Sequence, residues 1–243
     1  MLRGIYNAAY AMEMATRNHE IVAENIVNAT TPGYRRQGLL YEASVAAVQP
    51  STSADAARSS GVPGGASSYL HLEPGPLQQT NNPLDMAIDG AAFFVVQGPN
   101  GPLYTRNGSF ELGPTGDLHT RGGGYAVNGQ GGALTVPPEA GAIAVDADGT
   151  VTANGAQIGR LQLATFANPQ SLRRVGPTLF EGDAPETPQL NSVRVEQGYR
   201  EGSNVQPVQE MVSMMLGMRF YEAAGKAMQA LSDAIAQNTR PTP

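Results

Sequence analysis

The amino-acid sequence predicts an α+β protein, in which long N- and C-terminal helices pair as a coiled-coil-like stalk and a central all-β domain lies between them in the chain. Two observations lead to this fold class. Apolar residues recur at steps of three and four at both ends of the chain, which is the helical period. The middle carries short runs rich in Val, Ile, Leu, Phe and Thr, roughly every 8 to 12 residues, which is typical of strands.

The N-terminal helix is expected over residues 2 to about 30. It should stop at residues 30–33, because Pro32 disfavours helix at the residue before it and Gly33 permits a left-handed turn. The stripe has one polar member, which we interpret as a register residue in the helix seam. The stripe consists of Ile5, Ala8, Met12, Ala15, His19, Val22, Ile26 and Ala29.

The C-terminal helix is expected over residues 205 to about 237, and the two helices should pair because each has an apolar face to bury. Ser203 followed by Gln206 predicts a capping box, and Pro207 fits the first helical turn. Four methionines between residues 211 and 218 spread over more than one face, which favours burial among several helices. The stripe consists of Val205, Val208, Val212, Leu216, Phe220, Ala223, Ala227, Leu231 and Ala234.

Four segments are expected along the chain. These are the N-terminal helix of the stalk at 1–34, a linker or extended ribbon at 35–68, the central β domain at 69–200 and the C-terminal helix of the stalk at 201–243. The linker is predicted because small and polar residues dominate positions 44–68, where Pro and Gly recur.

The central domain is expected to be a sandwich or an irregular barrel without parallel β-α-β units, because no long helical pattern interrupts it. Turn signals such as Asn107-Gly108 and Asn154-Gly155 separate its strands. The expected strands are residues 84–88, 93–97, 103–105, 109–112, 124–127, 134–136, 142–145, 150–152, 159–166, 178–181 and 192–196.

Composition excludes several classes of function. The formal net charge is −6 and only 15 residues are Lys or Arg, so the basic surface of a nucleic-acid-binding protein is absent. Cysteine is absent, which excludes disulfides and thiolate metal sites. We expect no cleaved signal peptide, because polar residues interrupt the first 15 positions. We expect no membrane insertion, because no apolar run approaches the length of a span.

The sequence offers little support for catalysis or metal binding. Asp146–Gly149 is interpreted as an Asx turn, because it lacks the further ligands of a calcium loop. Glu111 and Asp117 are the acid pair considered for glycoside hydrolysis, and nothing in their sequence context supports that role. We therefore expect no catalytic residue, no metal and no cofactor. The histidines, which share no metal-ligand spacing, are His19, His71 and His119.

Motifs in a fixed order connect the chain to a known family. Residues 23–34 are similar to A-N-N-L-A-N-x-x-T-x-G-F/Y, residues 84–96 to L-D-x-A-I-x-G-x-G-F-F-x-V, residues 104–110 to Y-T-R-x-G-x-F, and residues 203–222 to S-N-V…E-M-V…R-x-Y/F-E. Together they resemble the bacterial flagellar rod and hook family of axial proteins, particularly the basal-body rod proteins. The motif residues are Thr31, Gly33, Tyr34, Leu84, Asp85, Ile88, Gly90, Phe93, Tyr104, Arg106, Gly108, Ser203, Asn204 and Glu222. Departures from the usual family residues are Ala11, Glu24 and Ala92.

This resemblance implies a structural subunit of the flagellar basal-body rod, which crosses the periplasm. It implies export through the flagellar type III apparatus and helical polymerisation into the drive shaft that transmits torque from motor to hook. The implied partners are copies of the chain, other rod and hook-family subunits and the export apparatus. Length and the segment 202–208 favour the proximal-rod type over the distal-rod type.

Contacts with other subunits are expected along both helices. Asn25 and Asn28 are predicted either to cap the N-terminal helix or to bond to a neighbouring chain. The expected interface residues are Ile5, Met12, His19, Val22, Asn25, Ile26, Asn28, Val205, Val208, Met211, Val212, Met215, Leu216, Arg219 and Phe220.

A protein of a different class stays open as an alternative. The chain would then be an exported glycan-binding or peptidoglycan-cleaving β domain on a helical anchor. The absence of Trp and of a convincing acid pair counts against it. An amphipathic membrane anchor at residues 1–30 is disfavoured, because its polar face is not rich in Lys and Arg.

Overall fold

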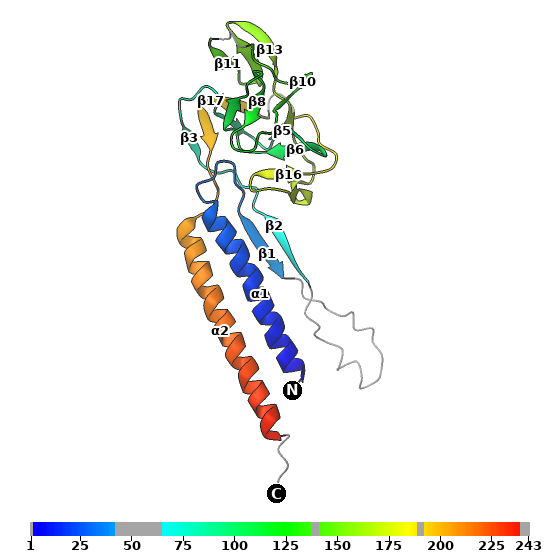
Figure 1. The fold of residues 1–243 in the computed structure, drawn as a ribbon, viewed down its shortest axis with the longest axis vertical. Coiled ribbons are helices and arrows are strands. Elements are labelled where there is room, and N and C mark those ends of the chain that lie inside the picture. The colour runs from blue at the N-terminus through cyan, green and yellow to red at the C-terminus, as the bar shows by residue number, and fades with distance from the viewer. Residues whose placement is uncertain (1, 42–64, 138–140, 189–191, 239–243) are drawn as a thin grey trace. The chain divides into compact units, whose positions relative to one another are not determined.

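The computed structural model describes residues 2–41, 65–137, 141–188 and 192–238 of the chain (Figure 1). The described residues form two compact units. The helical unit takes its residues from Met1–Val27, Gln37–His71 and Gln206–Pro243, and the β unit takes its residues from Asn28–Arg36 and Leu72–Val205. Each unit therefore combines segments that are far apart in the sequence.

Two long helices dominate the helical unit. The α1 helix (Leu2–Val27) and the α2 helix (Pro207–Asn238) lie side by side and antiparallel (Figure 1). A glycine of α1 leaves room for a side chain of α2: a Cβ added to Gly4 would lie 2.9 Å from Leu231 Cδ1, whereas one added to Gly217 of α2 would be in ordinary contact, 3.7 Å from Asn18 Nδ2. The predicted α+β class, with a helix at each end and a β-rich centre, is confirmed.

The residues of the predicted α1 stripe lie on the side that is shielded from solvent. All of its positions are buried or half-buried, and Ala8, Ala15 and Val22 are the most fully covered. The helix ends at Val27, earlier than the expected end near residue 30. Gly33 adopts the expected left-handed conformation, with φ of +70°.

The predicted stripe of α2 meets α1 only in part. Leu231, a member of the stripe, lies against Gly4 of α1. Nearer the start of the helix the shielded side carries Glu210, Gly217 and Ala224 instead. The predicted pairing with α1 is therefore wrong for the large members of the stripe in this part of the helix. These members, which are between 45% and 75% exposed, are Val208, Val212, Leu216 and Phe220.

The start of α2 differs from the prediction in one detail. Pro207 occupies the first turn, as expected, because its missing N–H group costs little there. The capping box is wrong, because the Ser203 hydroxyl accepts a hydrogen bond from Val205 N at 3.2 Å, ahead of the helix. Gln206 supplies the carbonyl that accepts the Glu210 N–H at 3.1 Å.

A two-stranded ribbon lies beside α1 in the same unit (Figure 1). The β1 strand (Gln37–Tyr41) pairs antiparallel with β2 (Ala66–Leu70), so that Gln37 faces Leu70. These strands form the two ends of the segment predicted as a linker or extended ribbon. Residues 42–64, which carry most of the predicted linker, lie outside the described residues.

The β unit consists of short strands, and every strand pair among its described residues is antiparallel, as predicted. Its largest sheet has the order β14-β5-β6-β16-β15, a second has the order β11-β12-β13, and the other strands form two-stranded pairs. The strands are β3 (Leu77–Gln79), β4 (Met86–Asp89), β5 (Phe93–Gly98), β6 (Gly101–Thr105), β7 (Phe110–Leu112), β8 (Leu118–Thr120), β9 (Asn128–Gly129), β10 (Gly132–Ala133), β11 (Ile143–Val145), β12 (Thr150–Ala153), β13 (Ala156–Arg160), β14 (Leu163–Ala164), β15 (Arg173–Arg174), β16 (Leu179–Glu181), β17 (Arg194–Gln197) and β18 (Tyr199–Glu201).

Most expected strands occur close to their predicted positions. The single strand expected over 159–166 is wrong, because the chain leaves the sheet of β13 before it enters β14 in the five-stranded sheet. The segments 124–127 and 134–136, both expected as strands, make only isolated bridges, such as those of Val127 with Val96 and of Thr135 with Asp117. The sequence missed β8 and β18, whose few residues are too short for a clear apolar alternation.

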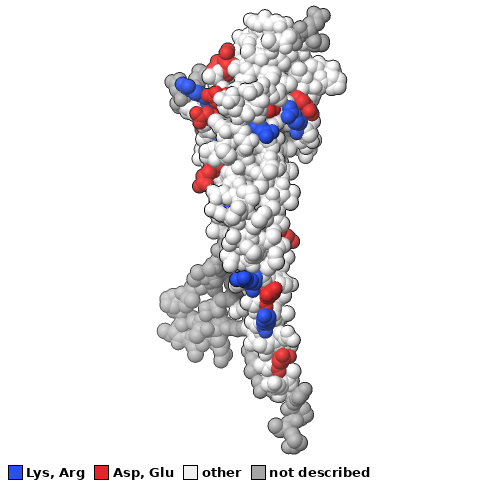
Figure 2. Space-filling model, turned by 90° about the vertical axis from the view of Figure 1, so that its left-hand side faces the viewer, with Lys and Arg blue, Asp and Glu red and all other residues white. Residues whose placement is uncertain are grey.

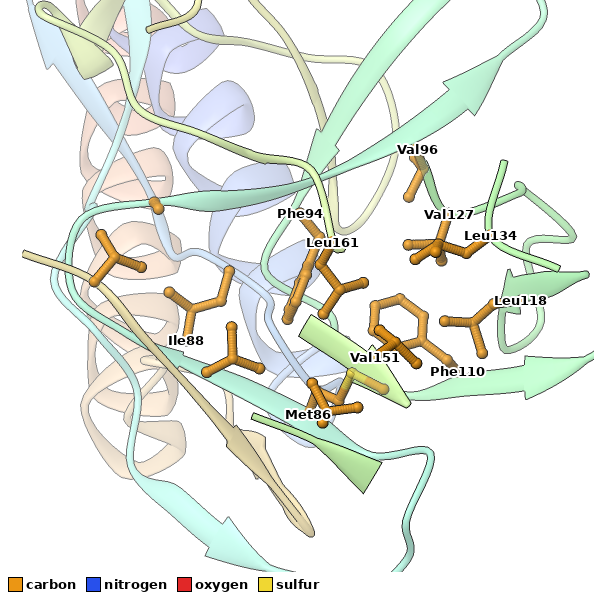
Figure 3. Close-up of a cluster of buried hydrophobic side chains, with 14 residues drawn as sticks. Met86, Ile88, Phe94, Val96, Phe110, Leu118, Val127, Leu134, Val151 and Leu161 are labelled. Carbon is orange, nitrogen blue, oxygen red and sulfur yellow. The ribbon is translucent and has the colours of Figure 1, made fainter. Parts of the chain in front are cut away.

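One hydrophobic core lies inside the β unit (Figure 3). Met86, Phe94 and Phe110 are fully buried at its centre, and the rings of Phe94 and Phe110 meet edge to face with centroids 5.1 Å apart. Gly108 passes directly against this core, where an added Cβ would lie 1.6 Å from the Met86 carbonyl oxygen. Only glycine fits at this position, because the contact is with backbone that cannot move aside.

Candidate functional site

A fully buried polar contact joins three elements of the helical unit. Asn25 Nδ2 of α1 donates to Glu210 Oε2 of α2 at 3.2 Å and to the Gln37 carbonyl at 2.9 Å. Asn25 Oδ1 accepts a hydrogen bond from Gln37 N at 2.9 Å. The side chains of Asn25 and Glu210 are both 0% exposed. We call Asn25, Gln37 and Glu210 the Asn25 layer.

The Asn25 layer fixes how α1 and α2 pair. A buried carboxylate without a hydrogen-bond donor is costly, so a pairing shifted by one turn would leave Glu210 among apolar side chains. Glu210 also lies in the first turn of α2, where the helix dipole favours negative charge. The Asn25 amide bonds to α2 and to Gln37 within this chain, and its predicted contact with a neighbouring chain stays a prediction.

A second buried cluster lies inside the β unit. The Glu201 carboxylate lies 2.6 Å from Arg35 Nη2 and 3.3 Å from Arg106 Nη1, and all three side chains are at most 5% exposed. Arg106 also donates to the carbonyl of Ile88 at 3.0 Å and to that of Gly90. We call Arg35, Arg106 and Glu201 the Glu201 cluster.

The Glu201 carboxylate helps to keep the buried Arg106 charged. Burial lowers the pKa of Arg106 to about 10, the Glu201 carboxylate opposes this shift, and the neighbouring Arg35 adds to it. A pKa of about 10 leaves the guanidinium cationic at neutral pH. The cluster therefore contains two buried cations against one carboxylate, and Glu201 is the residue that compensates them.

The Glu201 cluster brings together motif residues from three distant segments. Gly33 N donates to the Glu201 carbonyl at 2.9 Å, and a Cβ on Gly33 would lie 2.3 Å from Asn107 N. Asn204 Oδ1 accepts from Arg36 N at 2.7 Å. The ring of Tyr34 is fully buried beneath the Arg174 guanidinium, 4.4 Å away. The motifs near residues 33, 106 and 204 thus meet at one place in the β unit.

The other motif residues have mostly structural positions. Ile88, Phe93 and Tyr104 are buried in the β unit. The buried Asp85 accepts a hydrogen bond from Asn82 Nδ2 at 3.1 Å. Leu84 packs against the core. Gly90 lies beside Arg106, Gly108 lies against the core and Ser203 lies ahead of α2. Thr31 donates a hydrogen bond to Asn28 Oδ1, and Glu222 is exposed on α2.

An exposed apolar surface covers the first turns of α2. Between Pro207 and Met218 the one charged residue is Glu210, which is buried. On the α2 side of the helical unit, charged atoms gather toward one end of the helices and leave the rest uncharged (Figure 2). We call this surface the outer face of α2; its members, between 45% and 75% exposed, are Val208, Met211, Val212, Met215, Leu216, Met218 and Phe220.

The outer face continues into grooves on either side of Gly217. One groove of about 370 Å³ is lined by His19, Met218 and Tyr221, among others, and the other of about 670 Å³ by Tyr10, Leu216 and others. A helix that is apolar all round is usually buried on all sides. The single chain covers only the side that faces α1, so the outer face is a candidate surface for association.

The expected interface residues divide between inside and outside. Val22 is buried, and Val205 is buried in the β unit rather than on the stalk. Ile5, Met12, His19, Ile26 and Asn28 are half-buried, whereas Arg219 is exposed. The sequence missed Arg35, Glu201 and Glu210 as buried charges; the isolation of Glu210 in an uncharged stretch was a signal that could have found it.

Within the described residues, nothing assembles a catalytic or metal centre. No group of three or more His, Cys, Asp or Glu side chains there converges on a possible ion site. Hydrogen bonds from Thr115 and Thr135 hold the pKa of Asp117 below its usual range, whereas a general acid for glycoside hydrolysis needs a raised pKa. Asp148 accepts from Thr150 N at 3.0 Å, which confirms the predicted Asx turn. None of the described helices has the length and apolarity needed to cross a membrane.

Comparison with known proteins connects this architecture to one family. The model of the flagellar hook protein FlgE/F/G D1 domain matches residues 87–153, and that of the flagellar basal body rod FlgEFG protein C-terminal region matches residues 196–237. The flagellar basal-body rod protein FlgF of Salmonella typhimurium is 33% identical, covering 96% of this chain and 95% of that protein. FlgF of Caulobacter vibrioides is 32% identical over 87% of this chain and 86% of its own. The rod protein FlgG of Borreliella burgdorferi is 30% identical over 94% of both.

Replacing Glu201 by Gln should strongly destabilise the β unit. The substitution leaves Arg35 and Arg106 buried without a compensating charge, for which we expect a loss of about 3 to 5 kcal/mol in the free energy of unfolding. Urea unfolding followed by near-ultraviolet circular dichroism measures it. The control is Glu181→Gln, which breaks an exposed pair with Arg173 and should cost about 0 to 1 kcal/mol. Equal effects of the two substitutions would show that the cluster does not hold the β unit together.

A double-mutant cycle should detect coupling between Asn25 and Glu210. Each single change to Leu breaks the hydrogen bond between Asn25 and Glu210, and the second change cannot break it again, so we expect a coupling of roughly 0.5 to 3 kcal/mol. Thermal loss of helical circular dichroism is the measurement. The exposed pair Glu13 and Arg17, 2.8 Å apart on α1, serves as control with an expected coupling of about 0.2 to 0.5 kcal/mol. Additive effects at Asn25 and Glu210 would contradict the register role.

Proposed function

Because the chain belongs to the family of flagellar basal-body rod proteins, we propose that it polymerises helically into the drive shaft that transmits torque from motor to hook. The protein is a structural component of the flagellum and belongs in the basal-body rod. Its proposed partners are copies of itself and other rod and hook-family subunits. The outer face of α2 is the observation that carries the proposal.

The outer face has the extent expected of a surface that meets more than one neighbour. At 100° per residue, the outer face spans about 200° around the helix axis, from Met218 through Met215, Val212 and Leu216 to Phe220. A single helix contact uses an apolar stripe of about 100°. We therefore propose that at least two helices of neighbouring subunits pack against these turns of α2.

Burial of this surface would supply a strong driving force. Full burial of a Leu, Met, Val or Phe side chain is worth about 1.5 to 3 kcal/mol relative to exposure, and each member of the outer face is roughly half-exposed or more. Several such side chains per subunit, repeated along a polymer, offset the loss of translational freedom on association. The low charge of these turns avoids repulsion between copies.

Export and position along the rod are further parts of the proposal. We propose export through the flagellar type III apparatus without cleavage, as the family implies. The length of the chain and its segment 202–208 favour the proximal-rod type over the distal-rod type.

Mass spectrometry of isolated hook–basal bodies tests the proposed location and type. We expect this protein to be present in a fixed ratio to the other rod proteins, and a ratio below that of the distal-rod subunit supports the proximal type. The control is a basal-body preparation from a strain that lacks the gene. Absence of the protein from complete basal bodies would contradict the axial role.

Leu216→Asp should abolish motility without unfolding the protein. Leu216 is 59% exposed in the single chain, so aspartate is tolerated there, whereas in a packed interface it becomes an unpaired buried charge that costs several kcal/mol. Swimming assays and circular dichroism of the purified variant provide the two readouts. The matched control is Ser232→Asp, at an exposed polar position of the same helix. Normal swimming of the Leu216 variant would exclude the outer face as the assembly surface.

A further inference from the structure

We propose that Met211, Met215 and Met218 form an oxidation site that controls whether the free subunit can assemble. The inference rests on the proposed function, because it concerns the surface that assembly would cover. The three side chains are 52%, 55% and 47% exposed. Their spacing of four and three residues places them on one side of α2.

These three are the exposed methionines among the described residues. Met86 is 0% and Met14 is 5% exposed, while Met12, Met214 and Met228 are half-buried. The chain contains no cysteine, so no thiolate within it competes for an oxidant. A peroxide that reaches the free subunit therefore reacts first at the outer face of α2.

The chemistry is the transfer of one oxygen atom from hydrogen peroxide to sulfur. The sulfur lone pair attacks one peroxide oxygen, the S–O bond forms as the O–O bond breaks, and the departing oxygen leaves as water after the proton shifts to it. Sulfur is oxidised to the sulfoxide and the peroxide is reduced. The product is a polar, chiral side chain in place of a flexible apolar one.

The effect of the oxidant depends on whether it acts before or after assembly. In the free subunit it places up to three polar sulfoxides in the middle of the apolar surface, where burial without hydrogen-bond partners is unfavourable. In the assembled rod the same sulfur atoms are covered by neighbouring helices and are protected. Because methionine sulfoxide can be reduced enzymatically, an oxidised subunit is held out of assembly without being lost.

The first test compares the free protein with isolated basal bodies under the same limiting dose of hydrogen peroxide. Peptide mass mapping follows the gain of one oxygen atom at each methionine. In the free protein we expect oxidation of Met211, Met215 and Met218 to be several-fold faster than that of Met14 and Met86. In basal bodies we expect the three rates to fall several-fold. Equal rates at exposed and buried methionines, or unchanged rates after assembly, would overturn the inference.

The second test asks whether polarity at these positions blocks assembly. In one variant all three methionines become Gln, which imitates the polarity of the sulfoxide, and in the other they become Leu, which cannot be oxidised. Both are first compared by circular dichroism and thermal unfolding. We expect several-fold less of the Gln variant than of the Leu variant in basal bodies, and equal amounts would overturn the inference. The proposed function fails separately, if the unaltered protein is itself absent from basal bodies.

Discussion

The buried carboxylate of Glu201 is the interaction on which the β unit depends. It compensates two arginines that are themselves out of water, and its own backbone carbonyl accepts a hydrogen bond from Gly33. Its partners come from the segment that follows α1 and from the end of β6, while Glu201 itself precedes α2 in the chain. Because loss of Glu201 would leave two buried arginines without their compensating charge, these segments are held in one arrangement.

The same physical logic operates in the helical unit. The contact between α1 and α2 is made largely by small and apolar residues, which tolerate sliding. Asn25 and Glu210 do not, because their hydrogen bonds are satisfied in one register. Buried polar groups of this kind contribute less to net stability than to the choice of one arrangement over others. In both units a single carboxylate therefore sets the geometry, and apolar packing supplies most of the free energy.

The side chains of the outer face of α2, which we propose to drive assembly, are not those that hold the single chain together. The chain can fold while Val208, Leu216 and Phe220 remain exposed, because none of them is needed to join α2 to α1. A free subunit is therefore folded and yet carries an uncovered apolar surface. In the assembly that we propose, neighbouring subunits cover that surface, so the side chains that would favour assembly are also open to solvent and to chemical modification beforehand.

The sequence by itself determined the two helices, their approximate ends, the β-rich centre and the family. Long periodic patterns such as the α1 stripe contain enough repeats to be read locally, and motif order from Gly33 to Asn204 identifies the family. Strands such as β8 and β18 are too short to show a pattern. Only the tertiary structure decided which face of α2 meets α1, because the turns between Pro207 and Met218 are apolar on several sides and local periodicity does not choose among them. Only the tertiary structure placed Arg35, Arg106 and Glu201 together, since electrostatic compensation depends on distances between segments that no local pattern records.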